Sequence, residues 1–378
     1  MWEYPRPSRA ADYDDDRRKA RLREVRLGHN WHRGRQSRLI LLRLSLIPLA
    51  ILVIFGQYWT YDIAPERARL ARTVPSVSSI AGPTTAQGAD TAVFDLVGLG
   101  GLDAAETARA LPSLSALGSV WAVRYDNTGI DTKVIADLIV RVTDAARAPN
   151  VVLVGHSMGG VIALEIAKHL HLDSSKKVLA VLLDCTPIDL HAVRAESRDQ
   201  GEELMRWMGW FPGARESRVL RFVAETYARR DKYVTGRYDM DLGNLRDAVR
   251  EVLRDKILDS DVASTGLIAA QFKAIVAGGA ADDLRALAQS ADGKPPPAIV
   301  FIRPRNPYAD GVVDVEYSHQ ALIDRVGGVD GSLLVVTTRT TGHANPVQRP
   351  VEYNRVITQQ VVPFIRLVER ESSPAASR

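Results

Sequence analysis

Short apolar runs and segments with helical periodicity alternate along most of this chain. The apolar runs predict buried strands near residues 91–97, 119–125, 150–154, 178–183, 298–302 and 333–338. The periodic segments predict helices near residues 102–112, 130–147, 159–172 and 350–369. Because strands that alternate with helices form a mostly parallel sheet covered on both faces, we expect an α/β fold.

A different pattern occupies residues 44–61, which form a run of eighteen residues without a charge. This length is close to the lower limit for crossing a bilayer. Arg43 precedes the run, and the aromatic residues Tyr58 and Trp59 lie near its other end. A cleaved signal peptide is the alternative, but the preceding segment is long and no cleavage motif with small residues follows. We expect a single-pass anchor with a cytoplasmic N-terminus and an extracytoplasmic catalytic domain.

These patterns divide the chain into segments with different expected roles. Residues 187–297 show helical periodicity without a clear strand, which predicts a helical cap inserted into the sheet domain. The remaining expected segments are a basic cytoplasmic tail (1–43), a flexible linker rich in Ala, Pro, Ser and Thr (62–90), an α/β core (91–186 and 298–370) and a flexible C-terminal tail (371–378).

The sequence Gly155-His156-Ser157-Met158-Gly159-Gly160 directly follows the predicted strand at 150–154. A strand that runs through Gly-x-Ser-x-Gly into an apolar helix is the nucleophile-elbow arrangement. Glycines flanking the serine let the strand and the helix approach closely around a sharp turn. The serine hydroxyl then lies exposed at the end of the sheet, where it can act as a nucleophile.

A serine needs a base to take its proton and an acid to orient that base. Of the eight histidines, His343 lies between the last predicted strand and the C-terminal helix, where such folds keep the base. The acid should follow the preceding strand, and Asp310, in an Asp-Gly turn, is preferred there over Asp314. Asp184, at the end of the strand at 178–183, is a third candidate, although a turn or helix-cap role suits it better.

Two backbone amides would have to stabilise the negative oxygen that forms during acyl transfer. The helix after the elbow aims its N-terminus and the Met158 amide at that position. Gly98-Leu99-Gly100-Gly101 follows the predicted strand at 91–97, and its glycines let the backbone turn inward, so Leu99 is the second candidate donor. A plain Gly-rich turn is the alternative for this loop.

On these motifs, from about Thr91 to Val368, the chain resembles the α/β-hydrolase superfamily, and within it the serine lipases, esterases and thioesterases. The resemblance implies that Ser157 attacks, His343 is the base and Asp310 orients it, with Leu99 and Met158 as oxyanion donors. Many relatives have His-Gly before the oxyanion residue, whereas this chain has Val97-Gly98. This departure concerns the geometry of the loop more than the activity.

Charge and cysteine content narrow the function further. Residues 1–43 hold twelve Lys and Arg against six Asp and Glu, a net charge of +6, whereas the rest of the chain holds 37 against 39, a net charge of −2, so the total is +4. The basic excess therefore belongs to the tail beside the apolar run, which argues against nucleic acid as a partner. The single cysteine, Cys185, excludes an intramolecular disulfide.

We therefore expect a hydrolase of carboxylic esters or thioesters that acts on a small-molecule or lipid ester with a hydrophobic acyl group. The resemblance implies no metal and no organic cofactor. An acyltransferase, or an amidase or peptidase, on the same fold remains an alternative activity. A non-catalytic hydrolase-like module that binds partners at the membrane is the alternative from another functional class.

Overall fold

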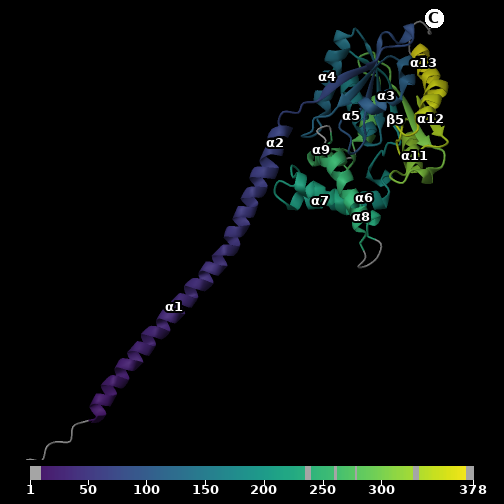
Figure 1. Cartoon of the computed structure of the whole chain (residues 1–378). Coiled ribbons are helices and arrows are strands. Elements are labelled where there is room, and N and C mark those ends of the chain that lie inside the picture. Colours follow the sequence, from purple (N-terminus) through teal and green to yellow (C-terminus); the bar gives the residue numbers. More distant parts are fainter. Residues whose placement is uncertain (1–9, 235–239, 259–261, 277–278, 327–331, 372–378) are drawn as a thin grey trace, which may run out of the picture. The chain divides into compact units, whose positions relative to one another are not determined.

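The computed structural model describes residues 10–234, 240–258, 262–276, 279–326 and 332–371. The chain forms two compact units, residues 1–62 and 63–378. The first unit consists mainly of helix α1 (Ala10–Tyr58), which runs without interruption through Pro48 (Figure 1). In the described chain, one helical stretch, Ser37–Leu70, is long enough to cross a bilayer and contains an 18-residue window with a mean hydropathy of 2.6.

The second unit is built on one seven-stranded sheet with the strand order β1-β3-β2-β4-β5-β6-β7. Strand β1 pairs antiparallel with β3, and all other neighbouring strands are parallel. The six strands expected from the apolar runs are all present. The strands are β1 (Ser76–Ala81), β2 (Thr91–Leu96), β3 (Ser119–Arg124), β4 (Asn150–His156), β5 (Lys177–Asp184), β6 (Ala298–Pro304) and β7 (Leu333–Thr338).

The expectation of a flexible linker at 62–90 is wrong. This segment contains helix α2 (Ala64–Leu70) and the edge strand β1. Although β1 is rich in serine, Val77 packs against the core on one face of the sheet and Ile80 against the core on the other. Backbone pairing with β3 therefore orders a segment whose composition alone resembles a linker.

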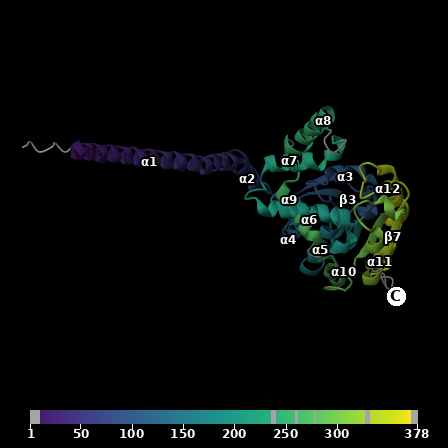
Figure 2. The same cartoon turned by 90° about the horizontal axis from the view of Figure 1, so that it is seen from below.

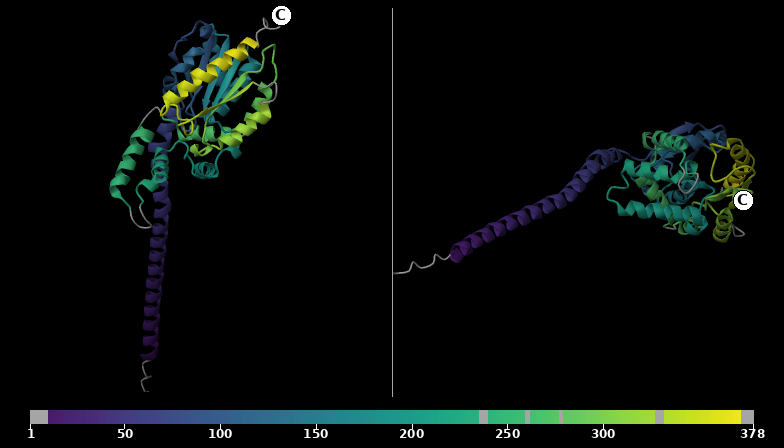
Figure 3. Two further views of the ribbon diagram at one scale, coloured as in Figure 1. Left: turned by 90° about the vertical axis from the view of Figure 1, so that its right-hand side faces the viewer. Right: turned by 60° about the horizontal axis from the view of Figure 1, so that its bottom comes forward.

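Helices cover both faces of the sheet, as the alternation predicted, and the two faces have separate apolar cores. Successive strand residues point to opposite faces, so Phe94 and Leu153 belong to one core while Val93 and Val152 belong to the other. In Figure 3 the C-terminal helices cross one face of the sheet. Helices α4 (Thr132–Ala145), α5 (Met158–Asp173) and α11 (Val315–Val326) lie on one face, and α3 (Ala105–Ala110), α12 (Pro350–Val356) and α13 (Val362–Glu371) lie on the other.

The segment expected as a cap, residues 187–297, is mainly helical in the part that the structure describes (Figure 2). Its last two helices also pack on the sheet domain, because Leu267 and Leu284 are fully buried in the core that surrounds α5. The last two helices of the expected cap are therefore part of the core of the hydrolase unit. Its helices are α6 (Ala195–Trp210), α7 (Arg218–Ala228), α8 (Leu242–Val252), α9 (Thr265–Val276) and α10 (Ala280–Leu287).

The expected C-terminal tail, 371–378, lies outside the described residues except for Glu371, the last residue of α13.

Candidate active site

Ser157 occupies the sharp turn between β4 and α5. Its backbone has φ 53° and ψ −123°, a conformation that costs energy for any residue with a side chain. The surrounding hydrogen bonds hold this turn, since the Ser157 N–H donates to the Asp184 carbonyl at 2.7 Å and its carbonyl accepts from Gly160 N–H at 3.0 Å. The structure thus has the sharp serine turn that the motif predicted, and the backbone of the serine is strained.

The two elbow glycines are required by close packing of the backbone. A Cβ at Gly155 would lie 2.4 Å from the Gly160 Cα. A Cβ at Gly159 would lie 2.5 Å from the Leu96 carbonyl oxygen, on β2. Both distances are far below van der Waals contact, so the turn accepts no side chain at either position.

Three side chains from distant parts of the sequence form a continuous hydrogen-bonded chain, here called the Ser–His–Asp chain. His343 Nε2 lies 2.8 Å from Ser157 Oγ, and His343 Nδ1 lies 2.9 Å from Asp310 Oδ2. The other oxygen of Asp310 accepts the amides of Val312 and Val313 at 2.9 and 2.8 Å. The Asp310 side chain is fully buried, whereas His343 is 22% exposed.

The environment of Asp310 favours its ionised form. Burial alone would raise the pKa of this carboxyl, but the hydrogen bond and charge of His343, together with the amides of Val313 and Val312, lower its pKa below the ordinary value. An ionised Asp310 accepts the Nδ1–H of His343, which leaves Nε2 free to accept a proton from the Ser157 hydroxyl.

The structure places the two alternative acids elsewhere. Asp314 accepts the amides of Glu316 and Tyr317 in the first turn of α11, at 3.2 and 3.1 Å, so it acts as a helix cap. The carboxylate of Asp184 contacts His156 rather than His343. Neither alternative acid is hydrogen-bonded to His343. The expected turn or helix-cap role of Asp184 is also wrong, because its carboxylate binds a side chain on the neighbouring strand.

The loop after β2, residues 98–101, packs directly against the elbow, and we call it the oxyanion loop after its expected role. A Cβ at Gly98 would lie 2.8 Å from the His156 carbonyl oxygen and 3.1 Å from Ser157 Cβ. Gly98 therefore lets this loop approach the serine closely, and Leu99 is the next residue in the loop. Met158, the other candidate donor, is the first residue of α5. Where many relatives have histidine, Val97 has its carbonyl held by the Tyr125 hydroxyl at 3.0 Å.

The cap holds the same loop through Gln271, which the sequence reasoning did not identify. This side chain, on α9, is fully buried. Its Oε1 accepts the Gly100 N–H at 2.9 Å and its Nε2 donates to the Gly101 carbonyl at 2.8 Å. About 170 residues separate the amide from the loop, so no local sequence signal relates them.

Among the described residues, one group of possible metal ligands adjoins the site. The ligand atoms of Cys185, Asp310 and His343 lie within 4.8 Å of one another. Asp310 and His343 already bind each other through a nitrogen and an oxygen that a metal would need. The Cys185 thiol is buried, and burial and the neighbouring carboxylates raise its pKa well above the ordinary value. Because the His343 and Asp310 atoms are already used in the hydrogen bond between them, we assign these two residues to the Ser–His–Asp chain.

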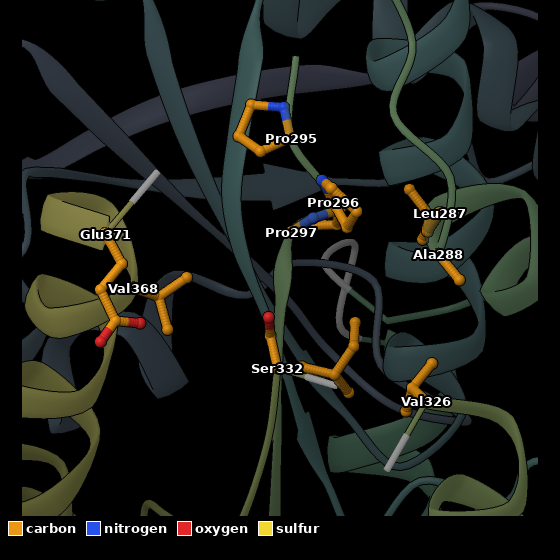
Figure 4. A pocket seen from close by; sticks show the side chains of 10 residues that line it. Leu287, Ala288, Pro295, Pro296, Pro297, Val326, Ser332, Val368 and Glu371 are labelled. Carbon is orange, nitrogen blue, oxygen red and sulfur yellow. The ribbon is translucent and has the colours of Figure 1, made fainter. Parts of the chain in front are cut away.

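The cavity in Figure 4 is not this site. Its volume is about 260 Å³, and its lining includes Pro297 and Ser332, which precede β6 and β7. Ser157 and His343 instead follow the carboxyl ends of β4 and β7. The cavity therefore lies at the amino ends of the parallel strands, and the Ser–His–Asp chain lies at their carboxyl ends.

A strained serine turn in a mostly parallel, doubly covered sheet defines the α/β-hydrolase fold. The chain belongs to the alpha/beta hydrolase family, whose model matches residues 56–356. No curated protein matches the sequence.

Solved structures that are similar to this chain include the three below, each 15% or less identical to it. A putative aryl esterase from Burkholderia cenocepacia is 15% identical, with a TM-score of 0.47 over 79% of this chain and 96% of that chain. The monoacylglycerol lipase of Paleococcus ferrophilus is 14% identical, with a TM-score of 0.47 over 77% and 99%. The proline iminopeptidase of Mycobacterium smegmatis is 13% identical, with a TM-score of 0.44 over 80% and 98%.

Proposed function

We propose that this protein is a serine hydrolase that cleaves a carboxylic ester or thioester through an acyl-enzyme on Ser157. The observation that carries the proposal is the Ser–His–Asp chain, with contacts of 2.8 and 2.9 Å in the order that proton transfer requires. The strained backbone of Ser157 adds support, because such strain persists where the surrounding structure enforces it and is frequent at active sites.

In the proposed reaction, His343 Nε2 takes the proton of the Ser157 hydroxyl as the oxygen attacks the substrate carbonyl. The amides of Leu99 and Met158 donate hydrogen bonds to the resulting oxyanion. His343 then protonates the leaving alcohol or thiol as the carbonyl re-forms. A water molecule, deprotonated by His343, attacks the acyl-enzyme in turn and releases the carboxylic acid.

We further propose that residues 44–61 anchor the chain in a membrane, with the N-terminal tail in the cytoplasm. The apolar helix and the basic residues that precede it support this arrangement. Protease digestion of inside-out and right-side-out vesicles tests it. The tail should be cleaved only in inside-out vesicles, and cleavage only in right-side-out vesicles would refute the orientation.

The activity is tested with the full chain in detergent and p-nitrophenyl esters of increasing acyl length, the wild type beside Ser157→Ala. A fluorophosphonate probe, which reacts with an activated serine, provides a readout that does not depend on the substrate. We expect turnover and labelling by the wild type and neither by Ser157→Ala. Labelling that persists in Ser157→Ala would refute Ser157 as the nucleophile. Cleavage of matched amides faster than esters would replace the esterase proposal with an amidase or peptidase.

A further inference from the structure

A histidine that the proposed reaction does not use is buried directly beside the nucleophile. His156, the last residue of β4, is 3% exposed and lies between two aspartates from the neighbouring strands. Its Nδ1 is 2.8 Å from Asp184 Oδ2 on β5. Its Nε2 is 3.0 Å from Asp95 Oδ1 on β2, within ion-pairing distance although not aligned as a linear hydrogen bond. We name Asp95, His156 and Asp184 the buried ion cluster.

Hydrogen bonds extend the buried ion cluster on both sides. The Thr107 hydroxyl, on α3, donates to the second oxygen of Asp95 at 2.7 Å. The Tyr353 hydroxyl, on α12, donates to the second oxygen of Asp184 at 3.0 Å and accepts the Asn345 amide at 3.2 Å. The cluster therefore joins three central strands to helices on one face of the sheet, and through Tyr353 it reaches the loop that carries His343.

Each member of the cluster is adjacent to a part of the active site. Asp95 lies three residues before Gly98, which packs against the elbow. His156 immediately precedes Ser157 in the sequence, and the Asp184 carbonyl accepts the Ser157 N–H. Asn345 follows His343 by two residues. The oxyanion loop, Ser157 and the loop of His343 are therefore each close, in the sequence or through a hydrogen bond, to a residue of the cluster or its extension.

The cluster favours a positive charge on the imidazole. Burial would lower the pKa of His156, but the charge of Asp95 and the interactions with Asp184 outweigh it and raise the pKa from 6.5 to about 10. The other titratable groups that face the cluster are Tyr125 after β3, Tyr353 on α12 and Cys185 after β5. Burial raises the pKa of all three, so they stay neutral while His156 is charged.

We propose that His156 is a positioning residue that acts as a cation. By binding Asp95 and Asp184, it holds the ends of β2 and β5 against β4. Ser157, the oxyanion loop and the His343 loop thereby keep their reactive geometry. Loss of the proton leaves two buried carboxylates facing each other across a neutral ring, which favours separation of the strand ends. The inference rests on the proposed function, because it concerns the reactivity of Ser157.

The test measures the rate of Ser157 labelling by a fluorophosphonate against pH in the full-length protein. The variant Asp95→Asn keeps the shape of the side chain but removes its charge. The matched control Thr107→Val removes the other partner of Asp95 and leaves the charge in place. In the wild type, the labelling rate should fall at alkaline pH, where His156 loses its proton. In Asp95→Asn we expect the midpoint of this fall to lie about one to three pH units lower, as expected for loss of a nearby opposite charge. We expect no such movement in Thr107→Val.

The outcomes separate the positioning role from the proposed function. Superimposable pH profiles for folded Asp95→Asn and wild type would overturn the positioning role, and so would an equal shift in Thr107→Val. Absence of wild-type labelling at every pH would instead refute Ser157 as an activated nucleophile. As a second readout, the ring N–H protons of His156, assigned by their loss in His156→Gln, should persist by NMR to about pH 9 in the wild type. Their loss near pH 7 would also overturn the proposal.

Discussion

Replacing Gln271 removes the one cap side chain that we find hydrogen-bonded to the oxyanion loop within the described residues. In Gln271→Met, a side chain of similar length leaves the Gly100 N–H and the Gly101 carbonyl without their partner. A fully buried unsatisfied group costs about 1–3 kcal/mol, and these two groups, which are only partly buried, cost less because water can reach them. The loop therefore shifts to find other partners, and Leu99, which adjoins Gly100, moves with it.

The magnitude of the kinetic effect follows from the proposed role of the Leu99 amide. Loss of one oxyanion donor lowers kcat by about 10²–10³-fold. We expect a fall of about 100-fold in Gln271→Met, with KM changed little, because the donor acts mainly in the transition state. In Gln271→Glu, a protonated carboxyl can still accept the Gly100 N–H and donate to the Gly101 carbonyl, so we expect a smaller fall, about tenfold.

The assay compares p-nitrophenyl ester turnover, fluorophosphonate labelling rates and urea unfolding. Phe272→Leu is the matched control, since Phe272 is the next residue on α9 and packs against Gly201 rather than the oxyanion loop. We expect this control to lower stability by about 1 kcal/mol and to keep kcat within about twofold. If Gln271→Met and Phe272→Leu lose similar stability and both retain wild-type kcat, the cap does not hold the oxyanion loop and the reasoning fails.

Two further substitutions and one change of pH test the site. In Asp310→Asn, the carbonyl oxygen is expected to accept the two loop amides and the NH₂ group to face His343 Nδ1, which imposes the wrong tautomer. We expect kcat for ester hydrolysis to fall by about 10⁴-fold, and a fall below tenfold would contradict the assigned acid. In Asp314→Ala, loss of the helix cap should lower the unfolding free energy by about 1 kcal/mol and leave kcat unchanged, whereas a large loss of kcat would restore Asp314 as the acid. Because the pKa of His156 is raised from 6.5 to about 10, its stabilisation is complete below pH 6.5 and is lost as the pH rises towards 10, by about 1.4 kcal/mol per pH unit. Urea unfolding at pH 7 and 9 should show this slope in the wild type and a shallower one in Asp95→Asn, and equal slopes would argue against a charged His156.

Much of the fold could be read from the sequence because buried parallel strands appear as short apolar runs, and helices between them as amphipathic periods. The elbow could be found because its glycines and serine lie within five residues of one another, and the glycines are needed there for the strand and the helix to pack closely. The edge strand β1 could not, since half-exposed serine-rich residues carry no strong pattern and only pairing with β3 orders them.

The acid shows where sequence reasoning reached its limit. Asp310 and Asp314 follow the same strand only four residues apart, and the Asp-Gly turn favoured Asp310 without excluding the other. The chain folds so that one carboxylate is buried against His343 and the other caps α11. Which aspartate meets the histidine depends on the path of the loop in space.

The sequence by itself determined the class of fold, the strained serine turn and a short list of partners, because those features depend on residues close together in the chain. Only the tertiary structure decided that Gln271 holds the oxyanion loop and that Asp95 and Asp184 enclose His156. An aspartate inside a buried strand does signal an unseen partner, since a buried charge must be paired. Its partner lies on another strand, however, and the packing of the whole sheet selects it.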